Sequence, residues 1–146
     1  SAVEQLVKEK GIYGFRESLD TRRLCCRIRK VEPLSRALKG LRAWVTGLRR
    51  DEAATRADLQ CVEIDAAHGG IVKINPLANW TDRQVRSYTR EHKLPYNDLL
   101  ERSYTSIGCA CCTRAIEPGE DPRAGRWWWE SPEHKECGLH VQNWQI

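Results

Sequence analysis

The sequence has no methionine, a single phenylalanine and no apolar run near the roughly 20 residues that a membrane-spanning helix requires. It does not open with a charged segment followed by an apolar one, so no secretion signal is indicated. It also has no internal repeat and no low-complexity segment. We therefore expect a soluble, cytoplasmic protein without a membrane partner. The missing initiator methionine suggests a trimmed or excerpted chain.

The composition is that of a globular protein with a mild excess of positive charge. The chain has 146 residues, of which 40% are hydrophobic and 30% charged, which fits one domain or part of one. Basic residues cluster at 25–30, 47–50 and 123–126, but the net charge is only +4 and the pI is 8.7. Nucleic-acid-binding domains usually have a pI above about 9. A small anionic ligand is therefore the better expectation, with no nucleic-acid partner.

The order of secondary-structure patterns predicts an α/β protein with a mostly parallel sheet. Helical patterns occupy 2–10, 32–40, 81–95 and 97–103, and strand patterns occupy 43–48, 59–65 and 70–76. Residues 11–23 are expected to form a loop or a short turn, and Thr81 with Gln84 predicts a capping box. Three strands make a thin sheet, and no glycine-rich phosphate loop is present. We therefore expect that strands upstream of this sequence are missing.

Four of the seven cysteines have the spacing of a metal site. An odd cysteine count without a secretion signal argues against a disulfide framework. Cys25 and Cys26 are adjacent, with Cα atoms about 3.8 Å apart, whereas disulfides usually span about 4.4–6.8 Å. Cys109 and Cys112 form a C-x-x-C pair, which can present two sulfurs to one centre. The four thiolates could hold zinc or a [4Fe–4S] cluster, and the adjacent pair favours iron–sulfur.

Two further cysteines are expected to be bystanders. Cys111 lies inside the C-x-x-C turn, but the standard spacing assigns the ligand roles to its neighbours. Cys61 falls in a predicted strand, where a small buried apolar residue is the ordinary interpretation.

Five stretches together resemble a known family: CCRIRKVEPL, AWVTGLRRDEAATRA, SIGCACCTRAI, GRWWWE and KECGLH. In this order they resemble the assimilatory adenylyl-sulfate (APS) reductases, the iron–sulfur branch of the phosphoadenylyl-sulfate (PAPS) reductase family. The resemblance runs from about residue 2 to 140 and covers the C-terminal portion of such enzymes. It implies an adenine-nucleotide α-hydrolase-like three-layer sandwich with a mostly parallel sheet, whose N-terminal part is missing. It also implies a partial reductase domain with an iron–sulfur site at 1–126 and a mobile C-terminal tail at 127–146.

The resemblance implies an activity and a set of site residues. Enzymes of this family reduce APS to sulfite and AMP through an S-sulfocysteine, with thioredoxin or glutaredoxin as reductant. Cys137 matches the catalytic nucleophile, and a [4Fe–4S] cluster would be held by Cys25, Cys26, Cys109 and Cys112. The residues that match substrate-binding positions are Lys30, Arg56, Arg123, Arg126 and His140.

Some features leave alternatives open. Relatives often have proline at the position of Cys111, which bears on the geometry and redox behaviour of the turn. A PAPS-specific reductase and a zinc-binding interaction or nucleic-acid module remain rival functions, and homo-oligomer formation is undecided. The tryptophans at 127–129 are expected to pack beneath the tail or at the sheet edge rather than to stack on RNA. Without the N-terminal part, we expect weak activity or none.

Overall fold

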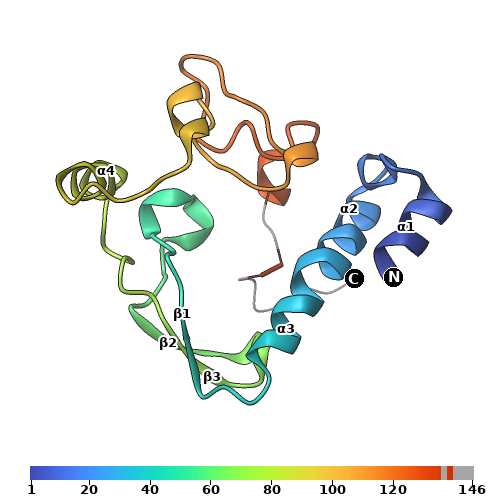
Figure 1. Ribbon diagram of the computed structural model, residues 1–146, viewed down its shortest axis with the longest axis horizontal. Helices are drawn as coiled ribbons and strands as arrows, with labels where there is room; N and C mark the ends of the chain where they lie inside the picture. The colour runs from blue at the N-terminus through green and yellow to red at the C-terminus, as the bar shows by residue number, and fades with distance from the viewer. Residues whose placement is uncertain (136–137, 140–146) are drawn as a thin grey trace. The chain divides into compact units, whose positions relative to one another are not determined.

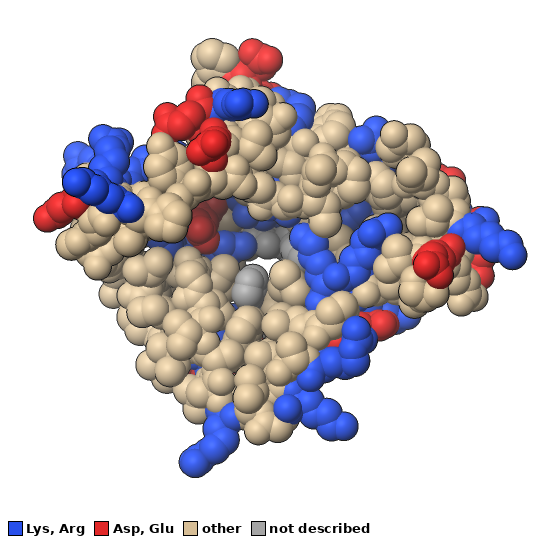
Figure 2. All heavy atoms as spheres, viewed as in Figure 1, with Lys and Arg blue, Asp and Glu red and all other residues tan. Residues whose placement is uncertain are grey.

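The computed structural model describes residues 1–135 and 138–139 (Figure 1). The chain divides into two compact units. The first unit comprises 1–44, 64–71 and the chain from Trp129 onward, and the second comprises 45–63 and 72–128. Over the described ranges, no helix combines the length and the apolar character needed to cross a membrane. Basic and acidic side chains are interspersed on the visible face (Figure 2), in keeping with the small net charge of +4.

The first helix of the first unit, α1, spans Ala2–Lys10, as its pattern predicted. Ser1 caps it, because the Ser1 hydroxyl accepts a hydrogen bond from the backbone N–H of Glu4 at 3.3 Å. Glu4 also pairs with the Ser1 amino group, which completes a capping box. The helix ends at Gly11, whose positive φ of 76° suits a residue without a side chain.

A second helical stretch runs from α2 (Leu19–Cys26) through a π turn (Arg27–Val31) into α3 (Glu32–Leu38). The prediction of a loop at 11–23 was therefore wrong from Leu19 onward. Ser18 caps α2 by a reciprocal exchange with Thr21, in which each side chain accepts from the other residue's backbone N–H. A threonine at this third helical position is a weaker sequence signal than the usual glutamate or glutamine. The prediction missed the helix for that reason.

The sheet has three strands, β1 (Ala43–Val45), β2 (Val62–Asp65) and β3 (Ile71–Ile74), in the order β1-β3-β2. All three lie within predicted strands but are shorter. The sheet is mixed rather than mostly parallel. Only residues 66–70 join β2 to β3, and a parallel connection needs a dozen or more residues. Cys61 precedes β2 and is exposed, so the expectation of a buried strand cysteine was wrong.

The second unit has a small apolar core of Leu48, Leu59 and Ala78. Next to it the fully buried Asn75 accepts from the Thr46 hydroxyl and donates from its amide to the Gln60 carbonyl at 2.7 Å. These bonds satisfy a buried amide and hold the chain that follows β1.

Helix α4 (Asp82–Glu91) also lies in the second unit, and its predicted capping box is confirmed. The Thr81 hydroxyl accepts from the Gln84 N–H at 3.2 Å, and Gln84 accepts from the Thr81 N–H at 2.8 Å. Later short helical turns span Asp98–Arg102 and Ala110–Cys112. The second of them carries the cysteines of the C-x-x-C sequence.

Candidate functional site

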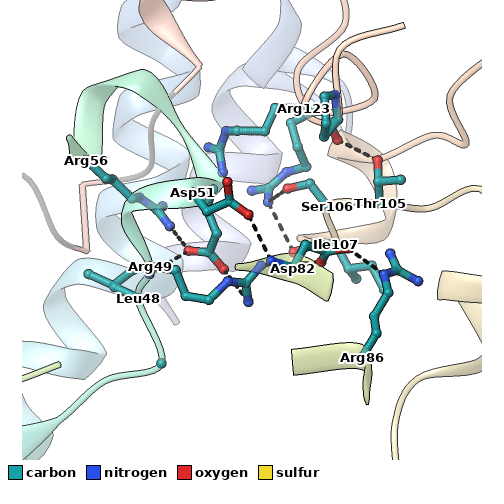
Figure 3. Close-up of a pocket in the computed structure, with 14 residues that line it drawn as sticks. Leu48, Arg49, Asp51, Arg56, Asp82, Arg86, Thr105, Ser106, Ile107 and Arg123 are labelled. Carbon is teal, nitrogen blue, oxygen red and sulfur yellow. Dashed lines mark hydrogen bonds and ion pairs between the residues drawn. The ribbon is translucent and has the colours of Figure 1, made fainter. Parts of the chain in front are cut away.

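A cavity of about 530 Å³ in the second unit brings together charged side chains from several segments (Figure 3). It is lined by the loop after β1, the start of α4, the segment at 105–107 and the segment at 122–126. Its cationic residues are Arg49, Arg56, Arg86, Arg123 and Arg126, and its acidic residues are Asp51, Glu52 and Asp82. Such a cavity offers several planar guanidinium groups, each of which can donate two hydrogen bonds to a phosphate, sulfate or carboxylate.

Glu52 organises one side of the pocket. Its carboxylate accepts from the Arg56 guanidinium and forms a second ion pair with Arg49 at 3.3 Å. The Arg49 backbone N–H also donates to the same carboxylate at 3.3 Å. Two short turns, Arg50–Glu52 and Ala54–Arg56, place the carboxylate and the guanidinium four residues apart on neighbouring turns. One acid therefore fixes the orientation of two arginines.

Asp82, the first residue of α4, organises another side. It forms ion pairs with Arg49 at 3.5 Å and with Arg86 at 2.5 Å. The first N–H groups of a helix have no acceptor within the helix. The backbone N–H of Asp82 is one of them, and it donates to the Asp51 carboxylate at 2.8 Å. These bonds connect the loop after β1 with the N-terminus of α4, so the two walls of the cavity are held together.

Arg126 is the most deeply placed of the pocket cations described, with 7% of its surface exposed. Its guanidinium donates to the Ile107 carbonyl at 3.1 Å and to the Ser106 hydroxyl at 3.4 Å. It also lies over the ring of Trp127, 4.4 Å from the ring centre. A Cβ atom at Gly108 would come within 2.5 Å of the Arg126 guanidinium carbon. Glycine at this position therefore makes room for the arginine.

The segment of Arg126 also supports the turn that carries Cys109 and Cys112. Thr113 forms an isolated antiparallel bridge with Arg126, and the Trp127 N–H donates to the Cys112 carbonyl at 3.1 Å. Within the turn, the Cys112 N–H donates to the Cys109 carbonyl at 2.9 Å. The pocket wall and the cysteine turn thus share one piece of backbone.

The sulfur atoms of this turn differ in exposure. Cys112 is buried, Cys109 is partly buried and Cys111 is exposed, with its sulfur 3.8 Å from that of Cys112. Two sheltered thiols in one tight turn suit a metal or cluster, whereas an exposed thiol between them does not need to be a ligand.

The adjacent cysteines lie in the first unit, where Cys25 is partly buried and Cys26 is buried at the end of α2. Lys30 follows in the π turn and is partly buried. In this turn the Glu32 N–H donates to the Arg27 carbonyl, five residues back instead of four. Lys30 follows Cys26 by four residues, but because these residues form a π turn, the two side chains are not related by one ordinary α-helical turn.

Neither cysteine pair makes a complete metal site by itself. Over the residues that the structure describes, no group of three or more histidine, cysteine, aspartate or glutamate side chains could hold a metal ion. The two pairs belong to different units, so each is described separately. An all-thiol donor set of two sheltered pairs fits an iron–sulfur cluster or zinc in its chemistry.

Three of the predicted substrate-binding residues, Arg56, Arg123 and Arg126, line the same cavity. Lys30 lies in the first unit, and Cys137 and His140 lie outside the described residues.

The prediction missed other residues of this pocket. Arg49 belongs to the basic cluster at 47–50, which had indicated an anion site without singling it out. Arg86 and the three acids gave no signal, because their pattern is that of an ordinary solvated surface.

Comparison with known proteins identifies the family. Residues 2–115 match the model of the phosphoadenosine phosphosulfate reductase domain, so the chain belongs to this family. Curated relatives are adenosine 5'-phosphosulfate reductases. The protein from Allochromatium vinosum is 57% identical over 139 residues, which are 95% of this chain and 54% of the relative. The Burkholderia cepacia protein is 56% identical over 140 residues, covering 96% of this chain and 56% of the relative.

A shorter relative and a solved structure agree with this assignment. The Rhizobium tropici protein is 50% identical over 139 residues and is covered to 77% of its length. A crystal structure of PAPS reductase from Candida auris, a phosphate complex, superimposes with a TM-score of 0.58 at 39% identity. That match covers 72% of this chain and 48% of the other. The chain therefore spans about half the length of most of the relatives named here.

Proposed function

We propose that this chain is part of an adenylyl-sulfate reductase, which reduces APS to sulfite and AMP with thioredoxin or glutaredoxin as electron donor. The observation that carries the proposal is the cavity lined by Arg56, Arg123 and Arg126, because the resemblance had assigned these three residues to the substrate. Relatives 50–57% identical to the chain bear the name of this enzyme. We also propose a cytoplasmic location, where thiols stay reduced.

The whole protein would have the adenine-nucleotide α-hydrolase-like sandwich. The mixed three-stranded sheet is one part of it, and the remainder of the sheet would come from the portion that the longer relatives have in addition. In this arrangement, 1–126 would belong to the reductase domain and 127–146 to the tail. The nucleotide would be held jointly by both portions, so this chain alone would bind APS weakly.

The pocket suits the phosphosulfate end of APS. A phosphosulfate carries two adjacent anionic groups, and guanidinium groups can pair with each of them in a bidentate manner. Arg126 and Arg123 would contact this end from one wall and Arg56 from the other. Lys30 and His140 are proposed as further substrate contacts.

The proposed reaction is covalent catalysis by Cys137. Its thiolate attacks the sulfonate sulfur, the bond between that sulfur and the phosphate oxygen breaks, and AMP leaves with the bonding electrons. A thiolate of thioredoxin then attacks the sulfur of Cys137 and releases sulfite, leaving a mixed disulfide. A second thioredoxin thiol resolves this disulfide and restores Cys137. The two electrons that reduce the substrate therefore come from two thiols, which end as a disulfide.

We propose that Cys25, Cys26, Cys109 and Cys112 hold a [4Fe–4S] cluster. When bound, the cluster supplies a charged, ordering centre for the site, since the two thiols already account for both electrons. The donor chemistry supports this assignment, as does the backbone that the C-x-x-C turn shares with Arg126. Zinc is the alternative occupant, and a colourless zinc-containing protein would contradict the cluster.

The test is mass spectrometry of the full-length protein after incubation with APS in the absence of reductant. We expect a sulfite adduct on Cys137 that thioredoxin removes. The Cys61→Ser variant, which changes an exposed cysteine, is the matched control and should form the same adduct. No adduct on Cys137, or an adduct on another cysteine instead, would overturn the mechanism.

A PAPS-specific reductase is the second candidate, favoured by the structural similarity to the Candida auris enzyme. The same experiment, repeated with PAPS at the same concentration as APS, distinguishes the two, because the preferred nucleotide forms the adduct on Cys137 faster. Faster labelling by PAPS would replace APS as the proposed substrate.

A further inference from the structure

A buried ion pair in the first unit joins residues that are far apart in the sequence. The Arg22 guanidinium donates to both carboxylate oxygens of Glu130, from Nε at 2.9 and 3.2 Å and from Nη2 at 2.8 Å. The side chains are only 1% and 8% exposed. The same Nη2 donates to the backbone carbonyl of His134 at 2.8 Å. One arginine on α2 therefore holds two points of the segment that leads to Cys137.

Aromatic packing reinforces this attachment. The ring of Trp129 lies 5.9 Å from that of Phe15, which is buried, and the Arg16 guanidinium lies 4.9 Å from the centre of the Trp129 ring. These contacts and the ion pair lie on neighbouring residues, Trp129 and Glu130. Apolar packing and a directional charge pair thus act on the same point of the chain.

The chemistry of the pair indicates positioning rather than simple stabilisation. Burying two charges costs much of what their attraction returns, and an apolar pair of similar volume often stabilises a fold as much or more. An apolar pair cannot fix the orientation of the segment. The forked guanidinium can, because it donates to three atoms of the segment: both Glu130 carboxylate oxygens and the His134 carbonyl oxygen. Burial would lower the pKa of Arg22, but the hydrogen bonds and charge of Glu130 raise it above its usual range. Arginine is not deprotonated in proteins, so the pair keeps its cation.

We propose that Arg22 and Glu130 are positioning residues that fix the point from which the catalytic cysteine is presented. Cys137 follows the attached carbonyl of His134 by three residues (137 − 134). An extended chain covers at most about 3.3–3.6 Å per residue, so the attachment keeps the Cα atom of Cys137 within about 11 Å of that of His134. The inference rests on the proposed function, because it concerns the role of Cys137 in that reaction.

Helix α2, which carries Arg22, also carries Cys25 and Cys26, two of the four proposed cluster ligands. Cys26 lies one turn after Arg22 on α2. The attachment of the segment at 129–134 and the position of Cys26 therefore share one helix.

The experiment uses the full-length holoprotein and the variants Glu130→Gln and Arg22→Lys. Glutamine keeps the shape of the side chain but loses its charge. Lysine keeps the charge but loses the fork, so it cannot hold Glu130 and the His134 carbonyl in the same way. Glu120→Gln is the matched control, because Glu120 also accepts two hydrogen bonds from one arginine, Arg114, but in the second unit and about one-third exposed.

Two measurements are made on each variant. Hydrogen exchange of the amides at 129–135 reports the attachment without substrate, and we expect it to become ~10–100-fold faster in Glu130→Gln. The rate of adduct formation on Cys137 at saturating APS should fall ~10-fold, with an unchanged half-saturating APS concentration. Arg22→Lys should show smaller changes in the same direction, and Glu120→Gln should match the wild type. Unchanged exchange in α1 serves as the check on folding.

The outcomes separate this inference from the proposed function. If the wild type forms no adduct, the proposed function fails, and the exchange measurement alone decides whether the pair attaches the segment. If exchange accelerates but the wild-type adduct rate is retained, the pair is merely structural and the inference is overturned. Unchanged exchange in both variants overturns it as well.

Discussion

The two units use arginine in opposite ways. In the first, Arg22 is almost inaccessible and its hydrogen bonds hold one carboxylate and one carbonyl of the same unit. In the second, five arginines and three acids surround a cavity of about 530 Å³ that is large enough for a ligand. Hydrogen bonds to protein acceptors do not separate the two roles, since Arg126 also donates to Ser106 and Ile107; the distinction is that Arg126 borders a cavity. Sequence spacing does not reveal this, because each has another arginine close by, Arg23 next to Arg22 and Arg123 three residues before Arg126.

The largest difference is expected between variants of Arg126 and Arg22. Arg126→Met should weaken APS binding to the full-length protein by at least ~30-fold, because a buried, hydrogen-bonded cation is lost from the pocket. Arg22→Lys should leave the APS affinity unchanged. Calorimetric titration measures both, and Arg83→Met, on the surface of α4, controls for the loss of one positive charge. Equal losses at Arg83 and Arg126 would show that only net charge matters.

A second change reaches Arg126 indirectly. Gly108→Ala would place a methyl group about 2.5 Å from the Arg126 guanidinium, so the side chain must move. We expect ~10-fold weaker APS binding with no loss of iron from the proposed cluster, since the cysteine turn keeps its own hydrogen bonds. Titration and iron analysis give the two readouts. A double variant with Arg126→Met should bind no more weakly than Arg126→Met alone, and additive losses would contradict the link.

A smaller effect is expected from the acid that orients two pocket arginines. Glu52→Gln removes the negative charge next to Arg56 and Arg49 while keeping the shape of the side chain. The arginines would lose orientation but gain net positive charge at the ligand. We therefore expect APS affinity to fall only ~3-fold at physiological salt and to become more salt-dependent. Titration at two salt concentrations measures this, and a salt dependence equal to that of the wild type would refute it.

The smallest effect should come from Glu133, close to Glu130 in sequence but exposed. A hydrogen bond from Ser131, with help from its own backbone N–H and from His134, lowers the pKa of Glu133. Its contribution to local stability is therefore present above the ordinary glutamate pKa and is lost as pH falls through the lowered value. Glu133→Gln should change hydrogen exchange at 129–135 less than ~2-fold at neutral pH. If Glu133→Gln accelerated this exchange as much as Glu130→Gln does, the predicted difference between the buried and the exposed carboxylate would be wrong.

Local signals in the sequence predicted local structure well. The Thr81–Gln84 capping box and helix α1 were found because every residue of the signal lies within one or two turns. Helix α2 was missed because Thr21 replaces the usual acid or amide of its capping box. The sheet was expected to be mostly parallel because the pattern of helices and strands does not encode strand direction, whereas the short connection at 66–70 bears on it.

The same contrast between local and long-range signals applies to the candidate site. The resemblance supplied Arg56, Arg123 and Arg126, which the structure gathers into one cavity. It could not supply Glu52 or Asp82, whose importance appears only through the arginines they orient. It also could not supply the Arg22–Glu130 pair, whose members are 108 residues apart. A pairing over such a distance is a property of the fold, and a single sequence contains no local trace of it.

The π turn at Arg27–Val31 has a consequence for how sequences of this kind are aligned. It holds one more residue than an α-helical turn, within a helix that is otherwise continuous from Leu19 to Leu38. A relative lacking that residue would have a more regular helix whose later residues face the same way, whereas one residue added to a regular α-helix would rotate everything after it by about 100°. An alignment that closes the one-residue gap elsewhere in the helix would pair Lys30 with a neighbour of its true counterpart. The gap belongs inside 27–31, where the backbone itself accommodates the insertion.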